Sequence, residues 1–235
     1  MEVGEPDFTP PQIVKKSLSE IFDEGFMKYG QAKGMPIFRE ALANYVSKKF
    51  NVKITQDNII VSPGARFSIF SAISTLLNPG DEMIVIEPAW PAYKDCALNA
   101  GIKVRTINTT LEEKWEPSIE HIENTINSNT KMIVLNYPNN PTGKILPEKL
   151  QDRIMEIAKE NNLYVLSDEI YSQYAKANWK SILSYNYEKS IVTQSFSKSH
   201  AMTGFRVGYA ITSKQIIEKM VKLEALCLTN VSEPI

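Results

Sequence analysis

The sequence predicts an α/β fold: a seven-stranded, mostly parallel sheet with helices on both faces. Three observations support this prediction. Short runs of consecutive apolar residues suit strands that are buried on both faces. Stretches with helical periodicity separate these runs, as expected where helices connect parallel strands. The chain has 235 residues and no internal repeat, so it is long enough for one large core.

Seven apolar runs are the candidate strands. In chain order they cover residues 59–62, 83–87, 102–107, 131–136, 163–167, 190–195 and 206–212. Most carry apolar residues at consecutive rather than alternate positions, which favours a sheet covered on both sides. Ligands of such sheets bind beyond the carboxyl ends of the strands. The residues that follow each run therefore form the candidate site.

Helical patterns lie between the runs, and one of them follows Gly64 directly. Proline suits the first turn of a helix, and the segments 35–50 and 147–161 each have one there. The segment 213–228 begins at Ser213, a residue type that caps helix N-termini. Their expected apolar stripes are Phe38, Leu42, Tyr45 and Val46, then Leu150, Ile154, Ile157 and Ala158, then Ile216, Ile217, Met220 and Leu223.

Composition argues against several classes of protein. The net charge is −1 with both signs spread along the chain, unlike a nucleic-acid-binding surface. No apolar run approaches the roughly 18 residues of a membrane span, and the first residues lack the pattern of a signal peptide. Cys96 and Cys227 match no metal or redox spacing, and two histidines are too few for a histidine-based metal site. We expect a cytoplasmic protein without metal, membrane or nucleic acid.

The turn after 59–62 has the features of an anion site. Gly64 permits a tight turn, and the amides of Ala65 and Arg66 then lie at a helix N-terminus, where they have no helical acceptor. An ordinary strand-to-helix turn explains the same residues. A G-x-G-x-x-G fingerprint is absent, so a nicotinamide cofactor has little support.

Two rigid loops follow the next strands. Trp90 lies between two prolines after 83–87, and its ring suits stacking on a flat heteroaromatic ring, although packing at a rim is the alternative. After 131–136 comes "YPNNPTG", a stiff polar turn from which Asn140 can direct its amide into a cleft. A purely structural turn is equally compatible with that motif.

Asp168 stands at the end of the buried run 163–167, where an unpaired carboxylate is costly and requires a cation or donor. Tyr171 follows three residues later, so we expect it one helical turn away and pointing the same way. The alternative for Asp168 is a helix N-cap with an acidic first turn.

The stretch "SFSKSHAMTGFRVGY", residues 195–209, follows the sixth run. Partial burial of Lys198 lowers the pKa of its amine, and a neutral amine attacks carbonyls to form a Schiff base. The hydroxyls of Ser195 and Ser197 and the guanidinium of Arg206 suit a phosphate. The alternative for Lys198 alone is a surface lysine.

Together these groups are the parts that hold pyridoxal 5′-phosphate. The amine binds the aldehyde, the hydroxyls and guanidinium bind the phosphate, and the tryptophan covers the ring. The carboxylate keeps the ring nitrogen protonated, so that the ring accepts electrons.

The sequence resembles the class I/II aminotransferases of PLP fold type I, a group that includes aspartate aminotransferase. The resemblance covers nearly the whole chain and lies in "GEPDF", "YGQAKGMPIFREAL", "NNPTG", "SDEIY" and the stretch at 195–209. It implies that residues 1–34 form a segment with substrate and dimer contacts, and that 35–235 form the large cofactor domain. The small C-terminal domain of that family, with its carboxylate-binding arginine, is expected to be missing from this chain.

The resemblance also implies a role for each motif residue. Lys198 is the Schiff-base lysine and proton shuttle, and Asp168 pairs with the ring nitrogen. The remaining implied contacts are Tyr171 and Asn140 to the phenolic oxygen, Trp90 to the ring, Ala65, Arg66, Ser195, Ser197 and Arg206 to the phosphate, Tyr29 to the phosphate of the other subunit, and Gly4, Asn140 and Arg66 to the substrate.

The implied reaction is ping-pong amino transfer between an L-amino acid and a 2-oxo acid by a homodimer. Arg66 stands where some relatives carry a lysine that binds the distal carboxylate, which favours aspartate or glutamate as substrate. Two alternatives stay open. One is a PLP-dependent lyase, by C–S β-elimination or aminocyclopropane formation, and the other is a non-catalytic PLP-binding module.

Overall fold

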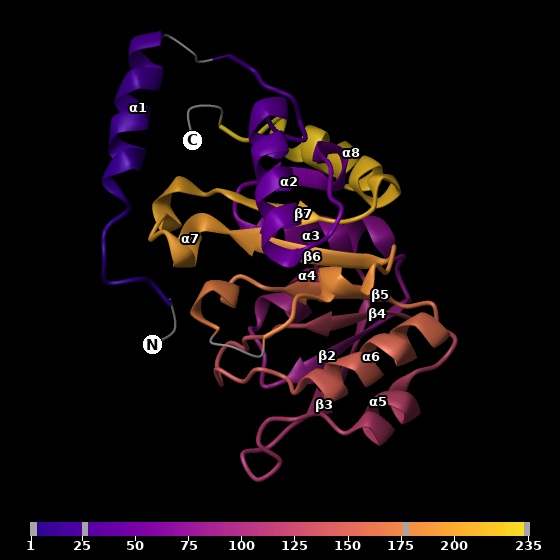
Figure 1. Ribbon diagram of the computed structural model, residues 1–235. Coiled ribbons are helices and arrows are strands. Elements are labelled where there is room, and N and C mark those ends of the chain that lie inside the picture. The colour runs from indigo at the N-terminus through magenta and orange to yellow at the C-terminus, as the bar shows by residue number, and fades with distance from the viewer. Residues whose placement is uncertain (1–3, 25–27, 176–178, 233–235) are drawn as a thin grey trace.

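The computed structural model describes residues 4–24, 28–175 and 179–232. Seven strands form one sheet in the order β1-β7-β6-β5-β4-β2-β3, with helices on both faces (Figure 1). The strands are β1 (Ile59–Ser62), β2 (Glu82–Glu87), β3 (Lys103–Asn108), β4 (Thr130–Leu135), β5 (Tyr164–Asp168), β6 (Ser190–Ser195) and β7 (Gly208–Ile211). β7 is antiparallel to both neighbours and the other pairs are parallel, which confirms the predicted fold class.

The helices are α1 (Gln12–Glu24), α2 (Pro36–Phe50), α3 (Ala65–Leu76), α4 (Ala92–Asn99), α5 (Ile119–Thr125), α6 (Glu148–Glu160), α7 (Phe196–Ser199) and α8 (Lys214–Leu228), with short 3₁₀ turns η1 (Gln56–Asn58), η2 (Ser172–Tyr174), η3 (Ile182–Tyr185) and η4 (Thr203–Phe205). α1 stands at one side of the sheet, whereas the longer helices that follow it cover the two faces (Figure 1). α2, α5 and α6 share one apolar core with the sheet, and α3, α4 and α8 share the other. Within β1, Ile59 and Val61 face the first core and Ile60 faces the second, as strand geometry requires.

Two details of the predicted elements are wrong. Tyr45 is 47% exposed, and the buried face of α2 instead includes Arg39, whose guanidinium donates to the backbone oxygens of Gly34 and Gln56. The run predicted at 206–212 becomes a strand only at Gly208, because Arg206 has a left-handed φ of 55° that no strand residue adopts. Ser213 takes the predicted N-cap position of α8, but its side chain makes no capping hydrogen bond.

The direction of β7 determines where Arg206 lies. Gly208, the first residue of β7, pairs with Ser195 and with Ser62, the last residues of β6 and β1. The residues just before β7 therefore lie at the same end of the strands as the residues that follow β6. As a result, Arg206 and Lys198 lie at one end of the sheet, although a short loop and η4 separate them in sequence.

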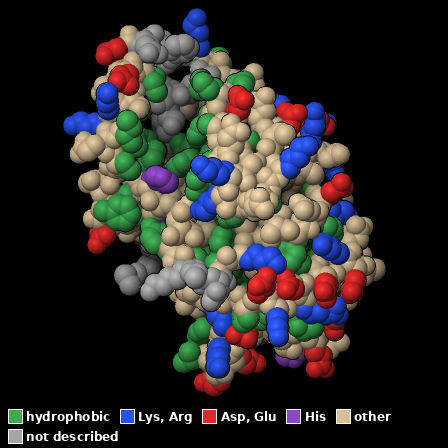
Figure 2. Space-filling model, in the orientation of Figure 1, with side chains coloured by type: hydrophobic (Ala, Val, Ile, Leu, Met, Phe, Trp, Pro, Cys, Tyr) green, Lys and Arg blue, Asp and Glu red, His purple; other side chains and the backbone are tan. Residues whose placement is uncertain are grey.

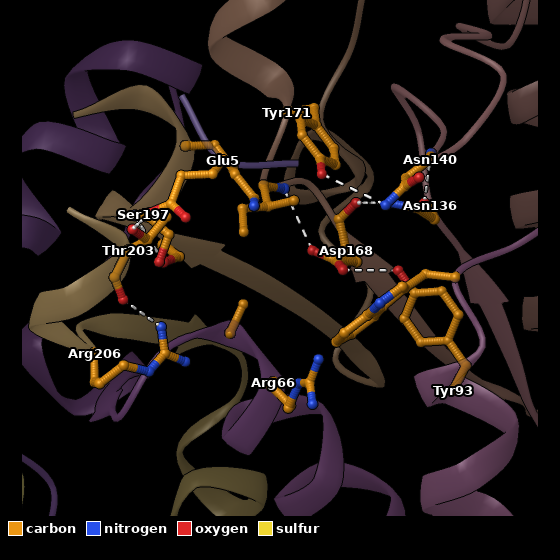
Figure 3. Close-up of a pocket in the computed structure, with 15 residues that line it drawn as sticks. Glu5, Arg66, Tyr93, Asn136, Asn140, Asp168, Tyr171, Ser197, Thr203 and Arg206 are labelled. Atoms are coloured by element: carbon orange, nitrogen blue, oxygen red, sulfur yellow. Dashed lines mark hydrogen bonds between the residues drawn. The ribbon is translucent and has the colours of Figure 1, made fainter. Parts of the chain in front are cut away.

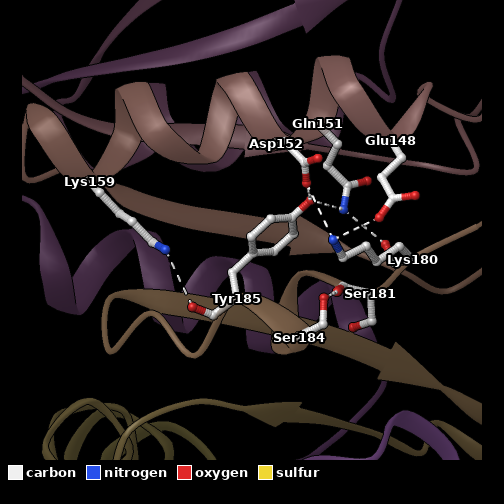
Figure 4. A network of polar contacts seen from close by, with 8 residues as sticks. All are labelled: Glu148, Gln151, Asp152, Lys159, Lys180, Ser181, Ser184 and Tyr185. Carbon is white, nitrogen blue, oxygen red and sulfur yellow. Dashed lines mark hydrogen bonds and ion pairs between the residues drawn. The ribbon is translucent and has the colours of Figure 1, made fainter.

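A polar network fixes the segment between β5 and β6 against α6 (Figure 4). The Lys180 ammonium lies 3.0 Å from Glu148 and 3.3 Å from Asp152, and the Tyr185 hydroxyl donates to Asp152 at 2.5 Å. The Gln151 amide donates to the Lys180 carbonyl at 3.0 Å. This network holds the connection that leaves β5 just beyond Asp168.

Candidate active site

A cavity of about 650 Å³ opens at the carboxyl ends of the strands (Figure 3). Its described lining comes from segments that follow five strands and from the N-terminal segment. The lining residues are Glu5, Ala65, Arg66, Trp90, Tyr93, Asn136, Asn140, Asp168, Ile170, Tyr171, Ser195, Ser197, Lys198, Thr203 and Arg206. Of the residues predicted to bind cofactor or substrate, Gly4 and Tyr29 are outside this set.

Asp168 ends β5 and is 4% exposed. Its carboxylate accepts hydrogen bonds from the Tyr93 hydroxyl at 2.7 Å, the Thr193 hydroxyl at 3.2 Å and the Ile170 amide at 3.3 Å. Burial raises the pKa of Asp168, and these three donors and the Lys198 ammonium oppose that rise. The predicted hydrogen-bond donors to Asp168 are therefore present. The segment from Asp168 to Tyr171 is not helical, so the predicted spacing of one helical turn between these residues is wrong.

Lys198 lies in the single turn of α7, which follows β6 directly. Its ammonium donates to the Gly4 carbonyl at 2.7 Å, so the N-terminal segment reaches the cavity. Burial lowers the pKa of Lys198. The Glu5 carboxylate raises this pKa, Arg206 lowers it further, and Asp168 raises it. The amine is therefore more easily deprotonated than that of an ordinary surface lysine.

One end of the cavity suits an anion. Ala65 and Arg66 are the first residues of α3, where amide groups have no intrahelical acceptor. The Arg206 guanidinium donates to the carbonyls of Thr203 at 2.8 Å and Pro63 at 3.3 Å, which brings it to the same turn. The Ser197 hydroxyl also lines the cavity.

Ser195 has a different local function from Ser197. Its hydroxyl accepts a hydrogen bond from the Ser197 amide at 3.0 Å and caps α7. It also lies 2.9 Å from the Val207 carbonyl and 2.9 Å from the Ser197 hydroxyl. Ser195 therefore orients the turn that carries Lys198, while it lines the cavity as expected.

The side walls are aromatic and polar. The Arg66 guanidinium lies 4.8 Å from the centre of the Trp90 ring, a cation–π contact. On the opposite side, the Asn140 amide lies 3.5 Å from the Tyr171 hydroxyl, and burial raises the pKa of Tyr171. The phenol is therefore a hydrogen-bond donor at neutral pH.

The two N-terminal residues of interest lie in different places. Gly4 has a φ of 58°, and a Cβ there would lie 3.4 Å from both the Lys198 amine and the Tyr171 hydroxyl. Its backbone thus borders the part of the cavity that contains the Lys198 amine and the Tyr171 hydroxyl. Tyr29 is 87% exposed and is not among the described residues that line the cavity of its own chain.

Five lining residues of the cavity were not predicted from the sequence: Glu5, Tyr93, Asn136, Ile170 and Thr203. Tyr93 and Asn136 hold Asp168 from two sides, since the Asn136 amide donates to the Asp168 carbonyl at 3.0 Å. Tyr93 follows β2 in the stretch "PAWPAY", and Asn136 is the first residue beyond β4, so their positions after strands were an available signal. Glu5 and Thr203 gave no such signal.

The described part of the chain contains neither a candidate metal site nor a helix that could span a membrane. Residues 4–24, 28–175 and 179–232 contain no group of three or more His, Cys, Asp or Glu side chains able to hold a metal ion. Over the same residues, every helix is too short or too polar to cross a membrane.

Comparisons with known proteins agree with this geometry. The family described as aminotransferase class I and II matches residues 1–234. An aspartate aminotransferase of Pyrococcus horikoshii is 38% identical over 98% of this chain and 59% of its own length. The crystal structure of an aspartate aminotransferase from Thermotoga maritima superposes with a TM-score of 0.96 at 32% identity, covering 99% of this chain and 63% of that one.

A further structural relative differs in its named substrate. The aromatic aminotransferase from Pyrococcus horikoshii has a TM-score of 0.94 at 31% identity and covers 99% of this chain and 64% of its own. The chain thus spans about six-tenths of the length of these relatives.

Proposed function

Since the chain belongs to the aminotransferase class I and II family, we propose that it is the cofactor-binding part of a pyridoxal 5′-phosphate-dependent aminotransferase. The enzyme transfers an amino group from an L-amino acid to a 2-oxo acid. One observation supports this most strongly: the Lys198 amine, the buried Asp168 carboxylate and an anion-binding turn meet in one cavity.

The residues present fit the cofactor. The amides that begin α3, the Ser197 hydroxyl and the Arg206 guanidinium form a phosphate site. Gly64 leaves room there, because a Cβ at this position would lie 2.6 Å from the Arg206 Nη2 atom. The Asp168 carboxylate, held by Tyr93, is suited to a protonated ring nitrogen.

When bound, the cofactor supplies an aldehyde for condensation and a ring that accepts electrons. Lys198 would provide the amine for that condensation, and once the amino group of the substrate has displaced it, its free Nζ atom would take the proton from the substrate Cα. Burial lowers the pKa of Lys198 and so favours the neutral amine that accepts this proton. Tyr171 and Asn140 would hydrogen-bond the phenolic oxygen of the cofactor, and Trp90 would cover its ring.

Covalent labelling tests the proposal. The purified chain is incubated with pyridoxal 5′-phosphate and reduced with borohydride, and its peptides are identified by mass spectrometry. We expect the label on Lys198, none in Lys198→Ala, and full labelling in Lys214→Ala, whose target is a surface lysine with 61% of its side chain exposed. Unlabelled Lys198 in folded protein would refute the function.

The substrate proposal rests on Arg66 and on the names of the relatives. Several similar proteins are aspartate aminotransferases, including those of Pyrococcus horikoshii and Thermotoga maritima. The exposed Arg66 guanidinium at the cavity wall suits the distal carboxylate of aspartate or glutamate. Gly4 and Asn140 are the other proposed substrate contacts.

We also propose a homodimer, in which Tyr29 reaches the phosphate site of the partner. The exposed position of Tyr29, outside the cavity of its own chain, supports this arrangement. Because the chain spans about six-tenths of the length of its relatives, amino transfer, substrates and assembly are proposals for the complete protein.

A further inference from the structure

The N-terminal segment and the loop before β7 meet at the cavity. The Thr203 hydroxyl donates to the Glu5 carboxylate at 2.5 Å, and the neighbouring Gly4 carbonyl accepts from the Lys198 ammonium at 2.7 Å. The Thr203 carbonyl accepts from Arg206 at 2.8 Å. Figure 3 shows the Glu5 side chain directed into the cavity, near Ser197 and Thr203. These contacts tie residues from opposite ends of the chain to the reactive lysine.

The charges around the cavity give Glu5 a distinct position. The described titratable or charged lining residues are Glu5, Arg66, Tyr93, Asp168, Tyr171, Lys198 and Arg206. Asp168 is buried and already accepts hydrogen bonds from Tyr93 and Thr193. Glu5 is the other carboxylate of this set, and it is exposed, as are Arg66 and Arg206, whereas Lys198 is half-buried.

Glu5 also acts on Lys198 through the electric field. Burial lowers the pKa of Lys198, and the Glu5 carboxylate is the strongest of the charges that oppose this change. A lysine that carries a proton between atoms must be neutral in one step and charged in the next. A nearby carboxylate lowers the cost of the charged step.

We propose that Glu5 is a positioning residue for Lys198: the Thr203 hydroxyl anchors its carboxylate at the cavity, where it stabilises the ammonium form and keeps Gly4 against the amine. The role rests on the proposed function, because it assigns Glu5 to the lysine that the reaction uses. It requires no direct contact between Glu5 and the substrate.

The test measures the reactivity of Lys198 in the protein without added cofactor. Reductive methylation by formaldehyde and cyanoborohydride is followed by peptide mass spectrometry over a pH series. In Glu5→Gln the midpoint for Lys198 should move to lower pH, with methylation about two- to fivefold faster at a fixed pH below the midpoint. Asp7→Asn removes the same charge from an exposed residue outside the cavity lining and should leave the profile unchanged. Equal profiles for the two variants would overturn the proposal.

A second variant separates the anchor from the charge. Thr203→Val keeps the shape of the side chain and removes the hydroxyl that holds Glu5. We expect a smaller shift in the same direction, and no added effect when it is combined with Glu5→Gln, because both changes act through one carboxylate. An additive effect would contradict the anchoring role. Borohydride labelling of Lys198 by pyridoxal 5′-phosphate is measured in parallel: labelling with unchanged methylation profiles refutes only the role of Glu5, whereas absence of labelling refutes the proposed function.

Discussion

At the scale of single residues, the buried Asp168 carboxylate is stabilised by a hydrogen bond from Tyr93, which is distant in sequence. Both Tyr93 and Asp168 are buried, and the hydroxyl donates at 2.7 Å. Tyr93→Phe leaves a buried carboxylate with one donor fewer, so we expect the free energy of unfolding to fall by about 1–3 kcal/mol. The same change should raise the pKa of Asp168 further, because the Tyr93 hydrogen bond lowers it. Urea unfolding measures the loss of stability.

The control for this change is Tyr174→Phe. Tyr174 is 54% exposed, and its hydroxyl donates to the Lys198 carbonyl at 2.6 Å. Water can replace that hydrogen bond, so the loss should stay within about 0.5 kcal/mol. Similar losses in both variants would show that burial of the Asp168 carboxylate does not set the cost.

Glu169 gives the molecule a pH-dependent stability. Its carboxylate accepts from the Ser181 hydroxyl at 2.8 Å and the Ile182 amide at 3.0 Å, yet burial raises its pKa from 4.5 to about 7. Between these values the folded chain holds a proton that the unfolded chain has released, so stability falls as the pH rises. Glu169→Gln removes this dependence. Relative to the wild type, the variant should gain about 3 kcal/mol between about pH 4 and about pH 8.

Urea unfolding at several pH values measures this gain in the free energy of unfolding. Glu188→Gln is the control, because Glu188 is an exposed glutamate of the same connection between β5 and β6. The stability curve of Glu188→Gln should run parallel to that of the wild type. If the Glu169→Gln curve is also parallel to that of the wild type, folding does not raise the pKa of Glu169.

Arg66 is the residue on which substrate choice should depend. Arg66→Ala keeps the amide at the start of α3 and removes the guanidinium from the Trp90 ring. If the guanidinium binds the distal carboxylate, kcat/KM for aspartate should fall about ten- to a hundredfold, with little change for alanine. Steady-state kinetics with both amino acids check this. Equal losses would mean that Arg66 acts on the cofactor and not on the distal carboxylate.

Part of the cavity could be predicted from the sequence, because Asp168 ends an apolar strand and Asn140 and Lys198 follow shortly after two others. Parallel strands end at a common edge, so position along the chain predicts position in space for such residues. Glu5 could not be found in this way. It reaches the cavity through Thr203, which lies 198 residues further along the chain, and no local pattern encodes that contact.

At the scale of elements, Gly208 allows β7 to approach the turn before α3. A Cβ at Gly208 would lie 2.6 Å from the Ala65 nitrogen and 2.7 Å from the Gly64 carbonyl carbon, which are backbone atoms that cannot rotate away. Gly208→Ala should therefore lower the free energy of unfolding by about 1–3 kcal/mol or more, and should weaken binding of phosphate-bearing ligands at this turn. Urea unfolding and cofactor titration measure the two effects.

Gly204 provides the matched control for Gly208. A Cβ at Gly204 would meet nothing within 4 Å, although the residue lies only four positions earlier. Gly204→Ala should change stability by no more than about 0.5 kcal/mol. Comparable losses in both variants would indicate that chain flexibility and not the close approach requires glycine.

The elements themselves were predictable to different degrees. Continuous apolar runs located all seven strands because burial on both faces leaves a strong signal. The sequence did not indicate that β7 is antiparallel, since such a run reads the same in either direction. The predicted helices did not include α1, α4, α5 or the single turn α7. In α4 two residues, Tyr93 and Ala97, are buried and in α5 one, Ile122, which is too few for a clear apolar stripe.

At the scale of the whole molecule, the N-terminal part of the chain exposes apolar side chains. α1 stands at one side of the sheet in Figure 1, and hydrophobic side chains gather in that part of the surface in Figure 2. Ile13 and Phe22 of α1 are 64% and 56% exposed, and Phe8 and Ile37 on either side are 50% and 72% exposed. Exposed apolar side chains concentrated in one part of a chain are typical of an interface, which favours the proposed dimer.

Hybrid dimers test whether Tyr29 completes the site of a partner. A Lys198→Ala chain retains Tyr29, and a Tyr29→Ala chain retains Lys198, so one cavity of the hybrid combines an intact lysine with Tyr29 of the partner subunit. The Tyr29→Ala protein alone should bind pyridoxal 5′-phosphate about ten- to a hundredfold more weakly, because a hydrogen bond to the phosphate is lost. After mixing and re-equilibration, borohydride labelling of Lys198 at limiting cofactor should recover in part, since only the hybrid cavity is complete. If Tyr29 instead serves the cavity of its own chain, mixing restores nothing, and sedimentation showing only monomers would exclude the shared site altogether.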